Sequence, residues 1–483
     1  MKYKFTILSI FLSVYNVIGQ TPVFQNTFAN TKGNIANYIS TIISQPDGST
    51  YFCGTNPDTL KIGTIQILPG NGGAFFGKLN TAGTPIWIKR GGTSSGASDI
   101  TYDVKTDNAG NVYFAGKIAG NLVASFDGIT LNSTYQGFVV KYTSSGNIIW
   151  AQGYGGAVYS IAIDQNNDPF INLSDGQLYK LDPANGNQLI SSLIGGNLMN
   201  PQWHNIVVDN NNNIIIGVGN KIRKFDSNLN QIWSTPLTAS LMETYRISLD
   251  GNGNVYGTFY AIFGTVTVGT ISKSNFPNGY MFKLDGTNGN PLLVDSIRIG
   301  GQASKIKEVI VDASNNYYFS GDGAFNEPHV LKTDNAYSVI WDKSLPTNAT
   351  ANDISLLSDN CLVVAGAQQG TSIFDATTVA APNGTSNLNN SYITGLCAGT
   401  VSINEFNDAA TFIVSPNPAS STITINLKNN SAESFALYNS IGQNVMSGIF
   451  SNTLNVNSLP NGLYYLTVSS DKNNYSKPLI INH

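Results

Sequence analysis

A seven-fold internal repeat constrains the fold of this chain more than any other feature. Each copy starts with an aliphatic stretch, a polar anchor, a tight turn and an aromatic strand, as in VKTDNAGNVYFAG at 104–116. The anchor positions are Gln45, Asp107, Asp164, Asp209, Asp250, Asp312 and the degenerate Leu357, which define repeats 1 to 7. Asp, Asn and Gly favour such turns because they bond the local backbone or tolerate positive φ. Each first half is therefore predicted to be a β-hairpin.

A second hairpin is predicted in the second half of each repeat, as in FVVKYTSSGNIIW at 138–150. A lysine is followed nine residues later by a large apolar residue. The pairs are Lys78 and Trp87, Lys141 and Trp150, Lys180 and Leu189, Lys224 and Trp233, Lys283 and Leu292, and Lys332 and Trp341. Two hairpins give four strands, which is the content of one propeller blade. The repeats therefore predict an all-β, seven-bladed β-propeller.

This pattern resembles the SBBP (seven-bladed β-propeller) repeats of exported bacterial proteins, and the resemblance spans about 42–397. Repeat 7 lacks the lysine and the closing strand, whereas TPVFQNTFAN at 21–30 precedes repeat 1 as an orphan strand. We expect this N-terminal segment to pair into the last blade, because closing the ring leaves no free sheet edge. The propeller domain is predicted at 20–404.

The first 19 residues are typical of a secretory signal peptide. Lys2 and Lys4 precede a short apolar stretch, and small residues follow at the expected cleavage point. The stretch is shorter than the roughly 20 apolar residues that span a bilayer, and nothing later in the chain is apolar enough. Charged residues are only 11% of the chain and form no basic cluster, so nucleic acid is not an expected partner.

The C-terminal segment 411–483, after a linker at 405–410, has the alternating pattern of a small Ig-like β-sandwich. Its motifs resemble the type A sorting domain of type IX secretion cargo in Bacteroidetes. The motif residues are Pro416, Asn417, Pro418, Gly442, Gln443, Leu459, Gly462 and Tyr464. The resemblance implies export first through Sec and then through the type IX machinery. It also implies a surface transpeptidase as partner, which removes the domain and attaches the cargo to lipopolysaccharide. An ordinary Ig-like accessory domain is the alternative.

No catalytic motif marks the chain. The three histidines are scattered, and neither a nucleophile elbow nor HExxH nor CxxC occurs. Turns such as DQNND and DGNGN offer oxygen ligands, but they lack the glutamate of a calcium loop, so side-chain-capped turns are the preferred interpretation. We therefore predict no catalytic residue, metal or cofactor.

A belt of polar residues is predicted near the propeller axis. Four residues before each anchor, on the expected innermost strands, stand Thr41, Asp103, Ser160, Asn205, Arg246, Glu308 and Asp353. With three acids and one arginine, this axial belt is a candidate site for a cation or a polyhydroxyl ligand. Bonding between neighbouring blades is the preferred interpretation, because buried polar groups need partners.

Three cysteines are too few for a disulfide scaffold. Cys361 and Cys397 fall on adjacent expected strands of repeat 7 and are predicted to form a cross-strand disulfide, which leaves Cys53 as a buried thiol.

Two function classes follow from these features. The first is an exported, non-catalytic surface or secreted module that binds a polysaccharide or protein. The second is a secreted carbohydrate-active lyase or hydrolase with its site on the axis, where belt carboxylates or the long spacers would supply the acid and base.

Overall fold

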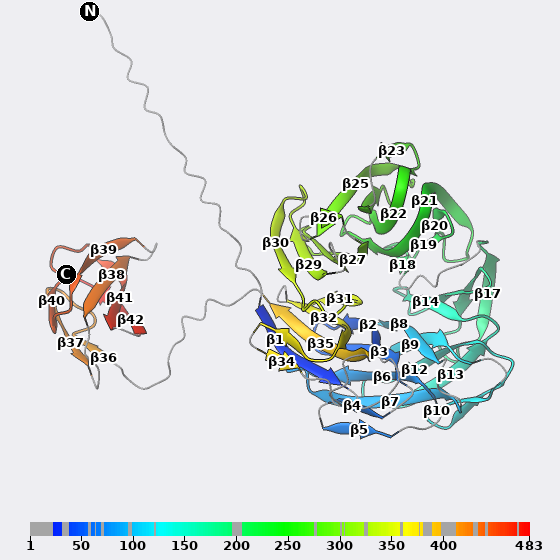
Figure 1. Cartoon of the computed structure of the whole chain (residues 1–483), viewed down its shortest axis with the longest axis horizontal. Coiled ribbons are helices and arrows are strands. Elements are labelled where there is room, and N and C mark those ends of the chain that lie inside the picture. The colour runs from blue at the N-terminus through cyan, green and yellow to red at the C-terminus, as the bar shows by residue number, and fades with distance from the viewer. Residues whose placement is uncertain are drawn as a thin grey trace, which may run out of the picture. The chain divides into compact units, whose positions relative to one another are not determined.

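The computed structural model divides into two compact units, Met1–Gly399 and Thr400–His483. Every described element is a β-strand, and among the described residues no helix is present that could cross a membrane (Figure 1). The expected signal peptide and linker lie outside the described residues. Those residues are 23–30, 38–56, 59–62, 64–68, 72–94, 99–119, 122–195, 205–274, 278–299, 302–303, 305–322, 327–357, 361–375, 377–379, 389–397, 412–427, 433–439, 443–470 and 473–483.

Inner strands surround a common axis in the larger unit. Each contacts the next one along the chain and the last contacts the first, so they form a closed ring (Figure 1). They are β2 (Tyr38–Ser44), β8 (Ile100–Thr106), β14 (Val158–Ile163), β18 (Ile206–Val208), the end of β21 (Gln231–Leu249), β27 (Lys305–Val311) and β31 (Asp353–Leu356). The larger unit is therefore all-β and propeller-like.

An antiparallel sheet runs outward from each inner strand. The second strands are β3 (Thr50–Thr55), β9 (Val112–Lys117), β15 (Pro169–Leu173), β19 (Ile214–Val218), β22 (Val255–Val268), β28 (Tyr317–Asp322) and β32 (Leu362–Gln369). The third are β6 (Ala74–Leu79), β12 (Gly137–Tyr142), β16 (Gln177–Leu181), β20 (Lys221–Phe225), β24 (Asn278–Leu284), β29 (Pro328–Thr333) and β35 (Asn389–Cys397). The outer ones in repeats 1 to 6 are β7 (Pro85–Thr93), β13 (Ile148–Tyr154), β17 (Gln188–Leu193), the start of β21, β25 (Pro291–Ile299) and β30 (Val339–Ser344).

The sheet of repeat 7 takes its outer strand from the start of the chain. β1 (Val23–Asn30) pairs antiparallel with β35, with Val23 opposite Cys397 and Asn30 opposite Ser391. This is the pairing expected for the N-terminal segment.

Additional short strands lie between the second and third strands of several repeats. β10 (Ala124–Phe126), which forms a hairpin with β11 (Ile129–Leu131), pairs with β7 of the preceding repeat. In the same way the end of β22 pairs with β21, which joins the sheets of repeats 4 and 5. Such pairing covers outer edges that would otherwise be open to other chains. The other short strands at such places are β4 (Leu60–Ile62), β5 (Ile65–Ile67), β23 (Ile271–Ser274), β33 (Ser372–Phe374) and β34 (Thr377–Val379). β26 (Gln302–Ala303) instead follows the outer strand β25 and pairs with it.

Tryptophans on the outer strands connect neighbouring sheets. Trp87 Nε1 donates to the Ser144 carbonyl at 3.1 Å, and Trp150 Nε1 donates to the Pro183 carbonyl of the next repeat at 3.1 Å. Trp150 also lies against Tyr113 of its own repeat, with ring centroids 5.8 Å apart. The tryptophan of the outer strand thus packs within its own sheet and donates a hydrogen bond to the next sheet.

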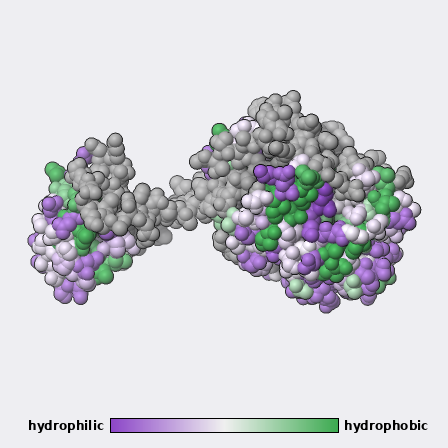
Figure 2. Space-filling view, turned by 90° about the horizontal axis from the view of Figure 1, so that it is seen from below, coloured by the Kyte–Doolittle hydropathy of each residue, from purple (hydrophilic) through white to green (hydrophobic). Residues whose placement is uncertain are grey.

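The residue opposite the repeated lysine is not nine positions later in every repeat. Lys78 and Lys141 stand opposite Trp87 and Trp150, but Lys180 stands opposite Ile190 and Lys283 opposite Leu293. The turn between the third and outer strands is one residue longer in repeats 3 and 5. Leu189 and Leu292, which stand nine residues after these lysines, are therefore not the residues opposite them, and both side chains are exposed. In Figure 2, hydrophobic residues on the visible face lie in groups interspersed with hydrophilic ones.

The smaller unit contains two antiparallel sheets. One is formed by β36 (Phe412–Ser415), β37 (Thr422–Leu427) and β40 (Thr453–Asn455), and the other by β38 (Ser434–Asn439), β39 (Asn444–Ile449), β41 (Gly462–Ser470) and β42 (Asn473–Ile481). Both contribute to one core, which includes Phe412, Ile425, Leu437, Leu466 and Leu479.

A disulfide connects the two central strands of the repeat 7 sheet. Cys361 and Cys397 are bonded, with Cα atoms 4.2 Å apart and a sequence separation of 36. Leu362 stands opposite Leu396 in the same ladder, so the bond joins two directly opposed positions. Cys53 is a buried free thiol.

Replacing both Cys361 and Cys397 with serine should lower the free energy of unfolding by about 3–4 kcal/mol, because a loop of this length is then free in the unfolded chain. Thermal unfolding with and without reductant measures the effect. Reductant should lower the midpoint of the wild-type chain but leave that of the double variant unchanged. An equal shift in both proteins would contradict the assignment.

Candidate functional site

The anchor aspartates hold the turns between the first and second strands. In repeat 2, Asp107 Oδ1 accepts the N–H groups of Ala109 and Asn111 at 3.0 and 2.8 Å. Asp107 Oδ2 accepts Asn111 Nδ2 at 2.9 Å, and Lys141 Nζ lies 3.2 Å away. These bonds recur around Asp209, Asp250 and Asp312, which pair with Lys224, Lys283 and Lys332. The turns are thus capped by their own aspartates, as the preferred interpretation expects.

These contacts control the charge of the anchor. Burial by itself raises the pKa of Asp209, but hydrogen bonds from Lys224 and Asn213 outweigh burial and hold the pKa below its ordinary value. The pKa values of Asp107, Asp250 and Asp312 are lowered for the corresponding reasons, with burial opposed by hydrogen bonds within each turn. These anchors are therefore ionised at neutral pH.

Repeat 3 departs from this arrangement. Asp168 and Phe170 replace the usual Asn and Tyr, so two side-chain donors to the anchor are lost. Lys180 pairs with Asp168 at 2.8 Å, and Asp164 Oδ2 is buried without a hydrogen-bond partner. Burial, with a further contribution from the Asp168 carboxylate, raises the pKa of Asp164. One anchor is thus destabilised by the change of its neighbours.

The seven belt residues are all buried near the axis. β-bulges precede several of them: the register shifts between Ile39 and Thr41, between Thr101 and Asp103, and between Ile306 and Glu308. A bulge turns the following side chain to a new direction. The belt is Thr41, Asp103, Ser160, Asn205, Arg246, Glu308 and Asp353, and each residue is at most 4% exposed.

Most belt contacts cross from one repeat to the next. Asp103 Oδ2 accepts Ser160 Oγ at 2.7 Å and the Ile161 N–H at 2.9 Å. Thr41 Oγ1 donates to the Tyr102 carbonyl at 2.8 Å. Asp353 Oδ2 accepts the N–H of Ile42 at 2.7 Å, which links the last repeat to the first. The expected bonding between repeats is therefore present.

Two cations neutralise the acids of the belt. The Arg246 guanidinium contacts the carboxylates of both Glu308 and Asp353. Lys105 Nζ donates to Asp103 Oδ1 at 2.7 Å, a partner that the sequence pattern did not include. Asn205 Nδ2 donates to the Gly217 carbonyl at 3.0 Å. The belt carboxylates are thus engaged within the protein rather than directed at an open site.

Amide side chains link the turns of repeats 2, 3 and 4. The Asn108 N–H donates to Asn167 Oδ1 at 2.8 Å, and Asn108 Nδ2 donates to the Gln165 carbonyl at 2.9 Å. In the next repeat the Gln165 N–H donates to Asn212 Oδ1 at 3.0 Å, and Gln165 Nε2 donates to the Asn210 carbonyl at 3.0 Å. Each link joins the residue after one anchor to the turn of the following repeat.

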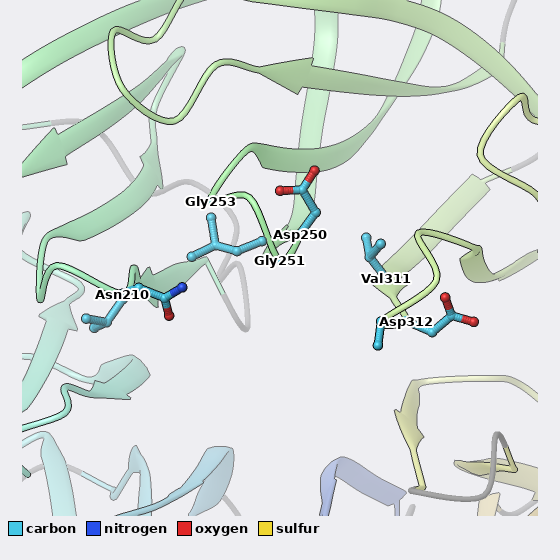
Figure 3. A pocket seen from close by; sticks show the side chains of 9 residues that line it. Asn210, Asp250, Gly251, Gly253, Val311 and Asp312 are labelled. Atoms are coloured by element: carbon cyan, nitrogen blue, oxygen red, sulfur yellow. The ribbon is translucent and has the colours of Figure 1, made fainter.

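This series of links ends at repeat 5, where Gly251 and Gly253 replace the amide residues. A hollow of about 370 Å³ opens there between the turns of repeats 4, 5 and 6. Val208, Leu249 and Val311 line it, together with Asn210 and the two glycines (Figure 3). Figure 3 shows the Asn210 side chain directed toward the turn of Gly251, whereas the Asp312 carboxyl group points away from that turn. We name this space the turn hollow.

The turn hollow is not among the sites predicted from the sequence, although the sequence carries a signal for it. Asn or Gln follows the anchor in repeats 2, 3 and 4, and Asn stands three residues after the anchor in repeats 3, 4 and 6. Glycine and asparagine both suit a tight turn, so either residue is unremarkable in a single repeat. The glycines of repeat 5 become visible only when these two positions are compared between repeats.

The sorting-motif residues mostly hold the smaller unit together. Asn417 Oδ1 accepts the Ile480 N–H at 2.8 Å and its Nδ2 donates to the Pro478 carbonyl at 3.0 Å. Tyr464 Oη donates to the Pro460 carbonyl at 2.8 Å, and Leu459 is buried in the core. Gln443 closes the turn between β38 and β39. Pro416, Pro418 and Gly462 are exposed, and Gly442 lies outside the described residues.

Residues 414–482 match the family model of the secretion system C-terminal sorting domain. This is the sorting domain of type IX cargo, so the chain is exported and is either secreted or attached to the cell surface. The domain also implies interaction with the secretion machinery. No curated protein matches the chain.

Three solved structures are similar to the chain at low identity. "Structure of U3-55K" has a TM-score of 0.49 and 10% identity, over 76% of this chain and 98% of that chain. The RRP9 WD40 repeats have a TM-score of 0.49 and 11% identity, over 78% of this chain and 99% of that chain. A protein of unknown function from Bacteroides caccae has a TM-score of 0.38 and 10% identity, over 61% and 93%.

The contrast between repeats 3 and 4 predicts different effects of the same Asp→Asn substitution on stability. Asp209→Asn should lower the free energy of unfolding at pH 7 by about 1–3 kcal/mol, because it leaves Lys224 without its charged partner. Asp164→Asn should have no such cost, since it removes the charge of a buried carboxylate whose Oδ2 has no hydrogen-bond partner, and the amide oxygen can still accept the N–H groups of Asn166 and Asp168. Urea unfolding of both variants at pH 7 measures the difference.

The pH dependence gives a second readout of the same pair. The pKa of Asp209 is lowered in the folded chain. Its contribution to the free energy of unfolding is therefore present above the ordinary pKa of about 3.9 and is lost as pH falls through the folded value. The loss of stability caused by Asp209→Asn should therefore become smaller below about pH 4. Asp164 has a raised pKa, so Asp164→Asn should be least favourable at low pH. Equal destabilisation by both variants at pH 7 would refute this account.

Proposed function

We propose that this chain is an exported seven-bladed β-propeller of the SBBP type that acts as a non-catalytic binding module. The closed ring of inner strands β2 to β31 supports the blade count, and the pairing of β1 with β35 supports a ring closed by the N-terminal segment. On this proposal residues 20–404 form the propeller and residues 411–483 form an Ig-like sorting domain.

The proposed route begins with a signal peptide at 1–19 and continues through the type IX machinery. A surface transpeptidase then removes the sorting domain and attaches the propeller to lipopolysaccharide. The match of residues 414–482 to the sorting-domain family supports this route. Attachment would hold the propeller at the surface of the cell, where a binding module meets its ligand.

The observation that carries the binding proposal is the turn hollow. Its volume of about 370 Å³ lies within the range of small-ligand sites, about 300–1,000 Å³. The Asp250 and Asp312 carboxylates on its rim are already bonded to Asn254 and Asn316 of their own turns. An acid and base for catalysis would need free carboxylates, so this site favours binding over turnover.

Gly251→Asn/Gly253→Asn should close the hollow and abolish ligand binding. A Cβ added at either glycine meets no atom within 4 Å, and Asn occupies similar positive φ at Asn212 and Asn315. Immobilised full-length wild type and the double variant are screened against neutral oligosaccharides and peptides. At least one compound should bind the wild type and not the double variant. The bound compound should be recovered from the wild type chemically unchanged.

Gly110→Asn is the matched control, because the same substitution in repeat 2 also meets no atom within 4 Å and lies away from the hollow. It should bind like the wild type. The proposal fails if no compound separates the wild type from the double variant, or if a bound oligosaccharide is cleaved.

A further inference from the structure

Strand β17 is the outer strand of repeat 3, and its outer edge is open. The sheet of this repeat runs in the order β14, β15, β16, β17 and ends there, and Figure 1 shows β17 at the periphery of the larger unit. On this strand Leu189 is 55% exposed and Leu193 is 70% exposed. No described strand pairs with the outer edge of β17, and solvent reaches both leucines.

The other outer strands of repeats 1 to 6 are protected from pairing with a second chain. β10 pairs with β7, and the end of β22 pairs with Leu237 and Thr238 on β21. β11 contacts β13, and β26 pairs with the end of β25. β30 carries Asp342 and Lys343, and Lys343 Nζ donates to Asp375 Oδ1 at 2.6 Å. Covering an edge and placing charges on it are the usual ways in which proteins block such pairing.

Within the described residues β17 has neither protection. Its sequence, QLISSL at 188–193, contains no charged residue and no proline. Side chains alternate between the two faces of a strand, so Leu189, Ser191 and Leu193 share one face, and all three are exposed. Asp175 and Asp182 stand in the turns at the two ends of β16, where their Oδ1 atoms accept backbone N–H groups. The edge thus presents its backbone and two leucines without a charge that would repel an identical strand.

We propose that β17 pairs antiparallel with β17 of a second copy of this chain, so that the two sheets join edge to edge. A two-fold axis at Ser191 places Leu189 of one copy opposite Leu193 of the other, and each Ser191 opposite its equivalent. The exposed faces of both strands then lie on the same side of the joined sheet. A slip of one residue would turn the exposed face of one strand to the packed side of the other, so the faces fix the register.

The chain already covers its other edges by this kind of pairing. β1 adds to the edge of β35, and β10 adds to β7, both in antiparallel register. Addition of a strand to an open edge is also a recurrent form of association between chains. Because the same surface of both copies is used, the association closes at two copies. A pairing of six residues from each copy is a small interface, which is typical of weak association.

Cysteine cross-linking of the full-length chain tests the register. Cys361 and Cys397 are bonded and Cys53 is buried, so an added surface cysteine is the reactive thiol. Opposed residues of an antiparallel pair have Cα atoms roughly 4.5–5.5 Å apart, which a disulfide can span. Under mild oxidation by air, Ser191→Cys should give a disulfide-linked dimer.

Ser192→Cys is the matched control for this experiment. It lies one residue further along the strand on the other face, and the proposed register sets it opposite Ile190 of the second copy rather than opposite itself. It should therefore stay monomeric on a non-reducing gel. Equal cross-linking of the two variants, or a Ser191→Cys chain that stays monomeric, would overturn the proposal.

Sedimentation velocity tests the same pairing without oxidation. The wild type should form dimers at concentrations on the order of 100 μM and dissociate on dilution, as a small interface requires. Ser191→Lys sets two ammonium groups opposite each other, and like charges directly opposed destabilise a strand pair, so this variant should stay monomeric. Ser344→Lys makes the same change at the exposed end of β30 and should dimerise like the wild type.

Two outcomes of this measurement contradict the proposal. One is a dimer that persists in Ser191→Lys, because the association would then use another surface. The other is a wild type that stays monomeric at the highest concentration, including one whose β17 edge instead binds an extended segment of another protein.

Discussion

The buried carboxylate at the start of the turn in repeats 2 to 6 is the interaction on which these repeats depend. Asp107 shows its three roles: it accepts two backbone N–H groups of the turn, it bonds Asn111 on the second strand, and it pairs with Lys141 on the third. The lysine also lies over the Tyr113 ring, 4.7 Å from its centroid. A buried ion pair of this kind is costly to break, because the remaining partner is left without compensation.

Repeats 3 and 5 depart from this arrangement in different ways, and only the departure in repeat 5 suggests a function. In repeat 3, Asp168 and Phe170 replace the side-chain donors to the anchor, so Asp164 Oδ2 has no partner, and the effect stays inside the repeat. In repeat 5 the anchor network around Asp250 is intact, but Gly251 and Gly253 stand where other repeats have the amide side chains that link neighbouring turns. The first change alters the charge state of one residue. The second opens a space that a ligand can enter, so we assign the proposed function to repeat 5 and its neighbours.

Features that recur at fixed spacings along the chain could be predicted from the sequence. These are the anchor turns, the four strands in each repeat and the opposition of Cys361 and Cys397. The nine-residue spacing does not mark the opposed residue in repeats 3 and 5, because the preceding turn is one residue longer and places Ile190 and Leu293 opposite the lysines. The belt could be located as seven polar positions, but its partners could not: Arg246 contacts acids from two other repeats, and Lys105 lies outside the pattern. These contacts depend on how the ring closes.

The central claim is that two glycines create the turn hollow by removing an amide link. A crystal structure of the Gly251→Asn/Gly253→Asn variant tests it most directly. We predict that the Asn210 N–H donates to the new Oδ1 at position 253, with the geometry of the Gln165 to Asn212 bond, and that the hollow is filled. A variant in which the turns of repeats 4 and 5 remain unlinked around an open hollow would contradict the account.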